Sequence, residues 1–171
     1  MLPAGWLVLA VAVAVLLTAW VTFTLTRLDR LHARVDAAQA ALDAQLVRRV
    51  AAVSQVLEMS GGGLADERRR HYEEVTRVAL HARDDDRQGA ENLVGRAVLE
   101  LVEDGGHLAP GAADELTEAA NRVLIARRFY NDAVRDTRAL RARRMPRLLH
   151  LAGNRPMPQF FDIDDTVPVR H

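Results

Sequence analysis

The stretch Arg127–Asp132 holds the densest group of side chains in this sequence that could do chemistry. Arginine, tyrosine and asparagine offer hydrogen-bond donors and acceptors in several directions, so together they can build a network between packed helices. Such a network would fix the register of the helices, or it would bind a partner helix, and the structural role is the commoner of the two. The members of this candidate network are Arg127, Arg128, Tyr130 and Asn131.

Metal and catalytic chemistry find little support in the sequence. His71 with Glu67 and Glu74 is the nearest approach to a metal-ligand set, but such a pattern is far more often a solvated helix face. The sequence holds no phosphate-binding glycine loop, nucleophile elbow or dinucleotide fingerprint. It also has no cysteine, so a thiolate zinc site, a disulfide and a cysteine nucleophile are excluded. We therefore expect no enzymatic activity, no metal site and no cofactor.

A second group of candidate residues is basic. Six arginines and one aspartate lie between Arg135 and Arg147, and three more arginines follow an apolar N-terminal run. If the two groups meet at a bilayer surface, each charge contributes about 1 kcal/mol toward an anionic leaflet. A solvated helix face paired with nearby aspartates explains them equally well. The candidate lipid-headgroup collar consists of Arg27, Arg30, Arg34, Arg138, Arg141 and Arg144.

The apolar N-terminal run predicts a membrane anchor. Residues 3–26 carry no charged side chain, and Trp6–Val21 is almost wholly Leu, Val and Ala. About 23 helical residues extend roughly 35 Å, enough to cross a ~30 Å hydrocarbon core. No basic residue precedes the run and no good cleavage site follows it, which favours an uncleaved anchor over a signal peptide. We expect one transmembrane helix, a single integral span.

The flanks of this span predict its orientation. Arg27, Arg30 and Arg34 directly follow the span and no arginine precedes it, so the positive-inside rule favours a cell-membrane protein with its N-terminus outside and its body in the cytoplasm. Small residues repeat every four positions within the span, which leaves a homo-oligomer formed through this stripe open. The stripe consists of Ala10, Ala14, Thr18, Thr22 and Thr26.

Glycine and proline divide the rest of the chain into helices. The first continues from the span to about Met59, with apolar residues at alternating spacings of three and four, as in a bundle helix or coiled coil. Gly61–Gly63 ends it. The later helices are expected at about 64–83, 88–103 and 110–144, with Asp84–Asp86 as the turn and acidic cap before the third.

The helix lengths predict the fold. The first and last helices are long, the middle two are short, and short connections favour antiparallel neighbours. We therefore expect an all-α fold, with an N-terminal transmembrane helix followed by an antiparallel helical bundle of four helices. The expected domains are the anchor at 1–26, the bundle at 27–151 and an extended C-terminal tail at 152–171. Phe160 and Phe161 are the residues expected to dock this tail.

Several stretches resemble the LemA family of bacterial membrane proteins. Asn121–Asp136 is similar to the family signature N-R-I-x-x-A-R-x-x-Y-N-x-x-V. Val35–Ala38 and Gln45–Arg49 resemble the V-D-A-A and Q-L-x-R-R stretches upstream. Pro146 and Pro156–Phe160 are similar to the closing F-P and P-x-P-x-F elements. The likeness covers residues 1–161 in order and spacing.

The chain departs from the family pattern at three places. Ser54-Gln55 stands where the family commonly has P-N, Thr137-Arg138 replaces a second Y-N, and Gly61–Gly63 is unusual. These changes indicate a divergent member. The resemblance implies an N-terminal membrane helix and an antiparallel helical bundle, and it implies no established enzymatic activity.

The overall charge bears on the class of partner. Basic and acidic side chains balance at 23 each and only 5% of residues are aromatic, which gives no support to nucleic-acid binding. We expect a single-pass membrane protein whose bundle is an interaction or scaffold module for a protein partner, without catalysis. The alternative is a membrane-remodelling or anionic-lipid-binding element that acts through the basic collar and self-association.

Overall fold

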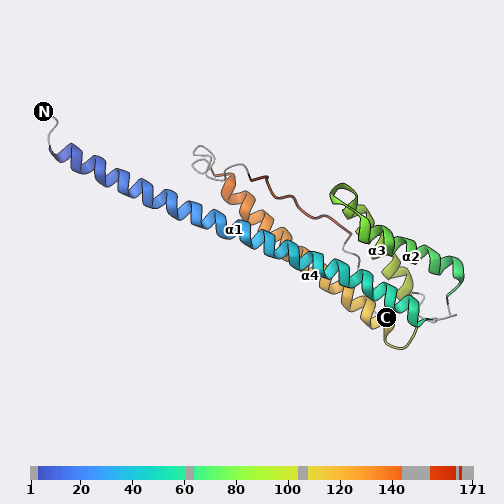
Figure 1. The fold of residues 1–171 in the computed structure, drawn as a ribbon. Helices are drawn as coiled ribbons and strands as arrows, with labels where there is room; N and C mark the ends of the chain where they lie inside the picture. Colours follow the sequence, from blue (N-terminus) through green and yellow to red (C-terminus); the bar gives the residue numbers. More distant parts are fainter. Residues whose placement is uncertain (1–3, 61–63, 104–107, 144–154, 165, 167–171) are drawn as a thin grey trace. The chain divides into compact units, whose positions relative to one another are not determined.

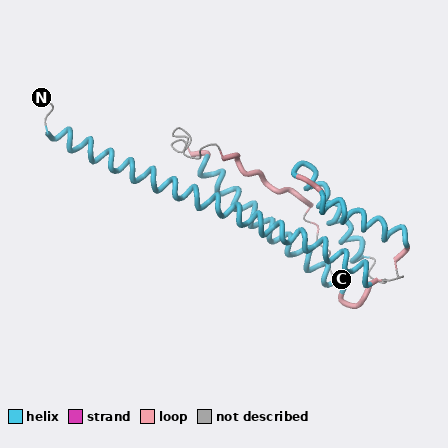
Figure 2. The backbone as a smooth tube through the Cα atoms, viewed as in Figure 1, coloured by secondary structure: helices cyan, strands magenta, loops and turns pink. Residues whose placement is uncertain are grey.

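The described part of the chain is entirely helical apart from its connections and its extended C-terminal segment. The computed structural model describes residues 4–60, 64–103, 108–143, 155–164 and 166. It holds four helices in these ranges and no strand: α1 (Ala4–Met59), α2 (Asp66–His81), α3 (Asp84–Glu103) and α4 (Ala112–Arg141). Figure 1 shows their order, and Figure 2 shows the helices and the connections between them. The predicted all-α fold with long first and last helices is confirmed.

Helix α1 is a single unbroken helix of 56 residues. The absence of proline and of interior glycine after Gly5 lets it continue from the apolar run into the body, as predicted. Its N-terminal part is long and apolar enough to cross a membrane. Only 6% of this apolar stretch is buried inside the structure. The apolar side chains of this stretch are therefore left without a protein cover in the described chain.

The threonine hydroxyl groups in this stretch are hydrogen-bonded to main-chain carbonyls of the same helix. Thr18, Thr22 and Thr26 each donate to the carbonyl oxygen four residues earlier, at 2.9 Å. Thr24 makes the same kind of bond to the carbonyl of Trp20. In an apolar medium an unpaired hydroxyl costs free energy, so this local bonding makes threonine compatible with a hydrocarbon surrounding.

The boundaries of the later helices differ slightly from the predictions. Helix α3 begins at Asp84, so Asp84–Asp86 forms its first turn and not a turn before it. The carbonyl of Arg83 accepts from Asp86 N and Arg87 N, and acidic residues are favoured in a first turn by the helix dipole. Helix α4 begins two residues after Pro110, because Gly111 has φ +84°, which no right-handed helix allows. Helix α4 ends at Arg141, a few residues before the predicted end near Arg144.

The chain forms two compact units, which are described separately. The first comprises Met1–Ala37 and Asp132–Gln159, and the second comprises Ala38–Asn131 and Phe160–His171. In the first unit, Leu28 and Val35 of α1 and Val134 and Leu140 of α4 are buried. The carbonyl of Leu31 accepts from Thr137 Oγ1 at 3.5 Å, and Arg34 pairs with Asp136 at 2.9 Å. Increasing numbers on α1 thus meet decreasing numbers on α4, which makes the two segments antiparallel.

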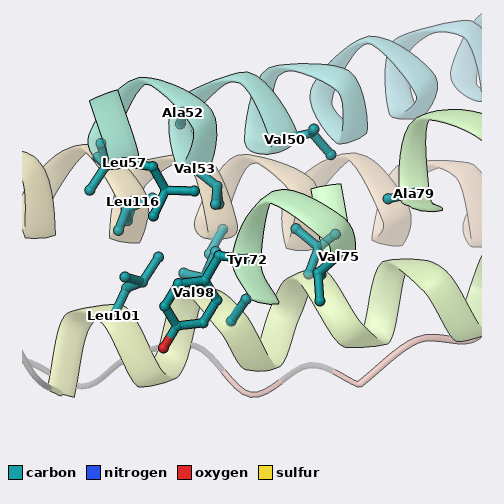
Figure 3. Close-up of a cluster of buried hydrophobic side chains, with 14 of the residues drawn as sticks. Val50, Ala52, Val53, Leu57, Tyr72, Val75, Ala79, Val98, Leu101 and Leu116 are labelled. Carbon is teal, nitrogen blue, oxygen red and sulfur yellow. The ribbon is translucent and has the colours of Figure 1, made fainter. Parts of the chain in front are cut away.

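The core of the second unit is shared by all four helices. Its buried cluster includes Val50, Val53 and Val56 from α1, Tyr72 and Val75 from α2, and further side chains from α3 and α4. Figure 3 shows the Tyr72 ring beside Val98, within this cluster. The Tyr72 hydroxyl accepts from Arg68 Nη2 at 3.1 Å and donates to Glu100 Oε2 at 3.3 Å, so the ring is buried while its polar end is paired.

Candidate interaction surfaces

Asn131 is the member of the predicted network with the clearest role. It lies on α4 in the second unit, where its amide Nδ2 donates to the carbonyl oxygen of Phe161 at 3.0 Å. Its Oδ1 accepts from the Phe161 main-chain N–H at 2.9 Å. Two residues of neighbouring antiparallel β-strands exchange the same pair of N–H and C=O hydrogen bonds. Asn131 therefore binds the main chain of the C-terminal segment.

The other three members of the predicted network do not converge on one point. Arg127 lies one helical turn before Asn131, and its Nη1 is 3.7 Å from the exposed Asp162 carboxylate. Tyr130 is buried. Its pKa is raised chiefly by burial and also by the nearby negative charge of Asp43. Arg128 is exposed. The structure therefore brings Arg127 and Asn131 together at the tail, places Tyr130 inside the unit and leaves Arg128 on the surface.

The described members of the candidate basic collar lie in the first unit. Arg27 and Arg30 are exposed, and Arg34 is paired with Asp136. Arg138 Nη1 donates to the carbonyl of Pro158 at 3.0 Å. Arg141 donates to the carbonyls of Pro156 and Arg155, each at 2.9 Å. The end of α4 thus holds the extended segment by its main chain, while Arg144 lies outside the described residues.

A buried ion pair that the sequence gave no reason to expect joins α1 to α3 in the second unit. Arg49 Nη2 donates to Glu91 Oε2 and to the Glu91 main-chain carbonyl, both at 2.8 Å. The two side chains are only 5% and 4% exposed. Burial lowers the pKa of Arg49, and the Glu91 charge and hydrogen bond oppose that shift. Its Nε atom is buried without a hydrogen-bond partner.

An open apolar groove runs between α1 and α4 in the second unit. Its volume is about 340 Å³, and Phe129 and Ile125 at its edge are 64% and 51% exposed. Small side chains form its floor, and two polar residues flank it. The groove is lined by Ala38, Ala41, Gln45, Arg122, Ile125, Ala126 and Phe129.

Acidic and histidine side chains do not gather into a metal site in the described part of the chain. No group of three His, Cys, Asp or Glu side chains there is arranged to hold a metal ion. Glu74, which the sequence placed near His71 and Glu67 as a possible metal ligand, instead accepts a hydrogen bond from Arg77 Nε at 2.8 Å on the surface of α2. The pKa of Glu74 is lowered chiefly by this hydrogen bond, as expected for a solvated ion pair.

We compared the chain with known proteins at the level of family, sequence and structure. No protein-family model, curated protein or solved structure matches the chain.

Proposed function

We propose that this protein is a membrane-anchored helical bundle that serves as an interaction module for a protein partner and does no catalysis. The observation that carries the proposal is the apolar groove between α1 and α4. Exposed apolar side chains that gather into one patch, here around a groove, are typical of surfaces that bind a partner. Phe129 and Ile125 are such residues, and the groove they border lies in a well-packed unit.

The chemistry of the groove fits an amphipathic helix of the partner. Ala38, Ala41 and Ala126 keep its floor low, so a third helix can approach the α1–α4 pair closely. Phe129 and Ile125 would pack against apolar side chains spaced three and four residues apart on that helix. Gln45 and Arg122 at the margin would meet its polar flank.

Ala41→Glu tests this groove. Placing a carboxylate on the groove floor should weaken partner capture at least tenfold, because a buried central position of an interface carries about 2 kcal/mol or more. The bundle itself should keep its unfolding free energy within about 0.5 kcal/mol, because Ala41 is exposed in the structure. Capture is measured by photo-crosslinking from p-benzoylphenylalanine at position 129 in the full-length chain in membranes.

The matched control places the same photoreactive residue at Arg128, which is exposed but does not line the groove. A single adduct that forms from position 129, is lost with Ala41→Glu and is absent from position 128 supports the proposal. Equal adducts from both positions, or an adduct that persists in Ala41→Glu, contradict it.

The membrane anchor and the family membership form part of the same proposal. The anchor is supported by the uncovered apolar stretch of α1 and by the self-satisfied threonine hydroxyls within it. The arginines that follow the stretch support an orientation in the cell membrane that leaves the body of the protein in the cytoplasm. Membership of the LemA family is supported by the motif order in the sequence. Self-association through the stripe of Ala and Thr residues remains compatible with these features.

Met59→Cys will label with a membrane-impermeant maleimide only after lysis of the expressing bacterium, if the body is cytoplasmic. The chain has no native cysteine, so a single label reports one position, and Met59 is exposed at the end of α1. Leu2→Cys, which precedes the apolar run, is the reciprocal control and should label in intact cells. The reverse pattern would place the body outside.

The alternative function is the binding of anionic lipid through the basic collar. Arg27 and Arg30 favour it, because they are exposed directly after the apolar stretch. Arg138 and Arg141 favour it less, since their guanidinium groups are engaged by carbonyl groups of Arg155–Pro158. We therefore place the interaction module first.

A further inference from the structure

The second unit binds its C-terminal segment mainly through main-chain groups. Asn131 of α4 hydrogen-bonds both main-chain groups of Phe161: its Oδ1 accepts from the N–H at 2.9 Å, and its Nδ2 donates to the C=O at 3.0 Å. Asn92 of α3 accepts from the Asp164 main-chain N–H at 2.8 Å. Two side-chain amides from two helices thus hold an extended chain at positions three residues apart. Contacts of this kind depend on an extended backbone and little on the side chains that it carries.

The side chains of this segment alternate between the unit and solvent. Phe161 is half-buried and Ile163 is 7% exposed, whereas Phe160, Asp162 and Asp164 are exposed. This is the period of two expected of an extended chain that lies along a surface. Ile163 shares its pocket with residues of α1, α3 and α4, and the space left beside it is only about 10 Å³. The residues around it are Arg49, Gly95, Ala120, Val123 and Leu124.

Basic groups stand beside the outward-facing carboxylates. Arg127 Nη1 lies 3.7 Å from Asp162. The pKa of Asp164 is lowered first by its hydrogen bonds from Thr166, and Arg96 adds an electrostatic contribution in the same direction. An acidic residue at either position is therefore favoured over a basic one.

We propose that this surface, the cradle formed by Asn131, Asn92 and the Ile163 pocket, is a peptide-binding site that the chain's own tail occupies in cis. It accepts an extended segment of a protein partner in which aromatic and aliphatic residues alternate with acidic ones, as in Phe161–Asp164. Within Phe161–Asp164 the cis segment is held by three main-chain hydrogen bonds and one buried side chain, few enough for a competing segment to displace it. Tethering gives the cis segment a high effective concentration, so the site is closed until a partner competes or the tail is released.

The test uses the full-length chain in detergent micelles and a fluorescein-labelled peptide with the sequence of residues 158–166. Ile163→Asp in the protein removes the buried anchor of the cis segment and leaves the cradle side chains in place. The labelled peptide should then bind at least tenfold more tightly than it binds the unaltered protein, by fluorescence anisotropy. Faster hydrogen exchange at the Phe161 and Asp164 amides of this variant reports release of the cis segment.

Two further variants separate the cradle from a general effect on folding. Asn131→Leu added to Ile163→Asp should weaken peptide binding at least tenfold, and Asn92→Ala tests the second amide if the first variant does not fold. Asn121→Leu in the same background is the matched control, because Asn121 is an exposed asparagine on the same helix. It should leave binding unchanged. A peptide that carries Asp in place of Ile163 should not bind.

Three results would overturn the proposal. They are unchanged hydrogen exchange in Ile163→Asp, peptide binding no tighter than to the unaltered protein, and equal binding of the peptide that lacks the isoleucine. The site uses neither the groove at Phe129 nor the apolar part of α1. Its failure is therefore distinguishable from failure of the proposed membrane module.

Discussion

Glu91→Leu will lower the free energy of unfolding by about 3–5 kcal/mol, the cost of leaving one charge of a buried ion pair without its partner. Arg49 is 95% covered, and its Nη2 atom now donates twice to Glu91, once to the carboxylate and once to the main-chain carbonyl. In the variant only the main-chain bond remains. Burial, which already lowers the Arg49 pKa, then acts without the opposing carboxylate charge. Chemical denaturation followed by circular dichroism in detergent measures the loss.

The double variant Arg49→Met/Glu91→Leu distinguishes a stranded charge from lost packing. Its side chains fill similar space without charge, so it should recover most of the stability lost in the single variant. Glu74→Leu on the surface of α2 removes a solvent-exposed ion pair with Arg77 and should change stability little. Equal losses in the single and double variants would mean that shape, and not charge, sets the cost at this position.

Val11→Arg/Val15→Arg will release the protein from the membrane fraction. Each arginine near the centre of a transmembrane helix costs about 2.5–3.5 kcal/mol for insertion, and two on one face cost roughly 5–7 kcal/mol together. Both valines are exposed in the structure, so no packing contact within the described chain is lost by the change. The measurement is the share of full-length protein that stays with membranes after alkaline carbonate extraction.

Val47→Arg/Ala51→Arg is the matched control for the anchor. It places the same two charges at the same spacing on an exposed face of the same helix, but in the body. This variant should stay with the membrane as the unaltered protein does. Equal extraction of both double variants would refute the anchor, and retention of the Val11/Val15 variant would mean that another part of the chain holds the protein there.

The sequence by itself determined the helices and the buried face of the longest ones. Leu28, Val35 and Leu42 on α1 recur every seven residues and are buried, and Leu31 and Ala38, which complete the predicted spacings of three and four, are half-buried. That success has a local cause, since the side chains that share a helix face are fixed by 3.6 residues per turn wherever the partner lies. The apolar N-terminal run is equally local, because its length and composition alone decide whether it can cross a bilayer.

Pairings between distant residues were decided only by the tertiary structure. Arg49 and Glu91 are 42 residues apart, and no local pattern links an arginine in an apolar stretch of α1 to one acidic residue of α3. The tail shows the same limit: Phe160 and Phe161 were expected to dock it, yet Phe160 is exposed, Phe161 is half-buried, and Ile163 is the buried side chain. In an extended segment either alternate set can face inward, and here the main-chain hydrogen bonds with Asn131 and Asn92 accompany the inward set that holds Ile163.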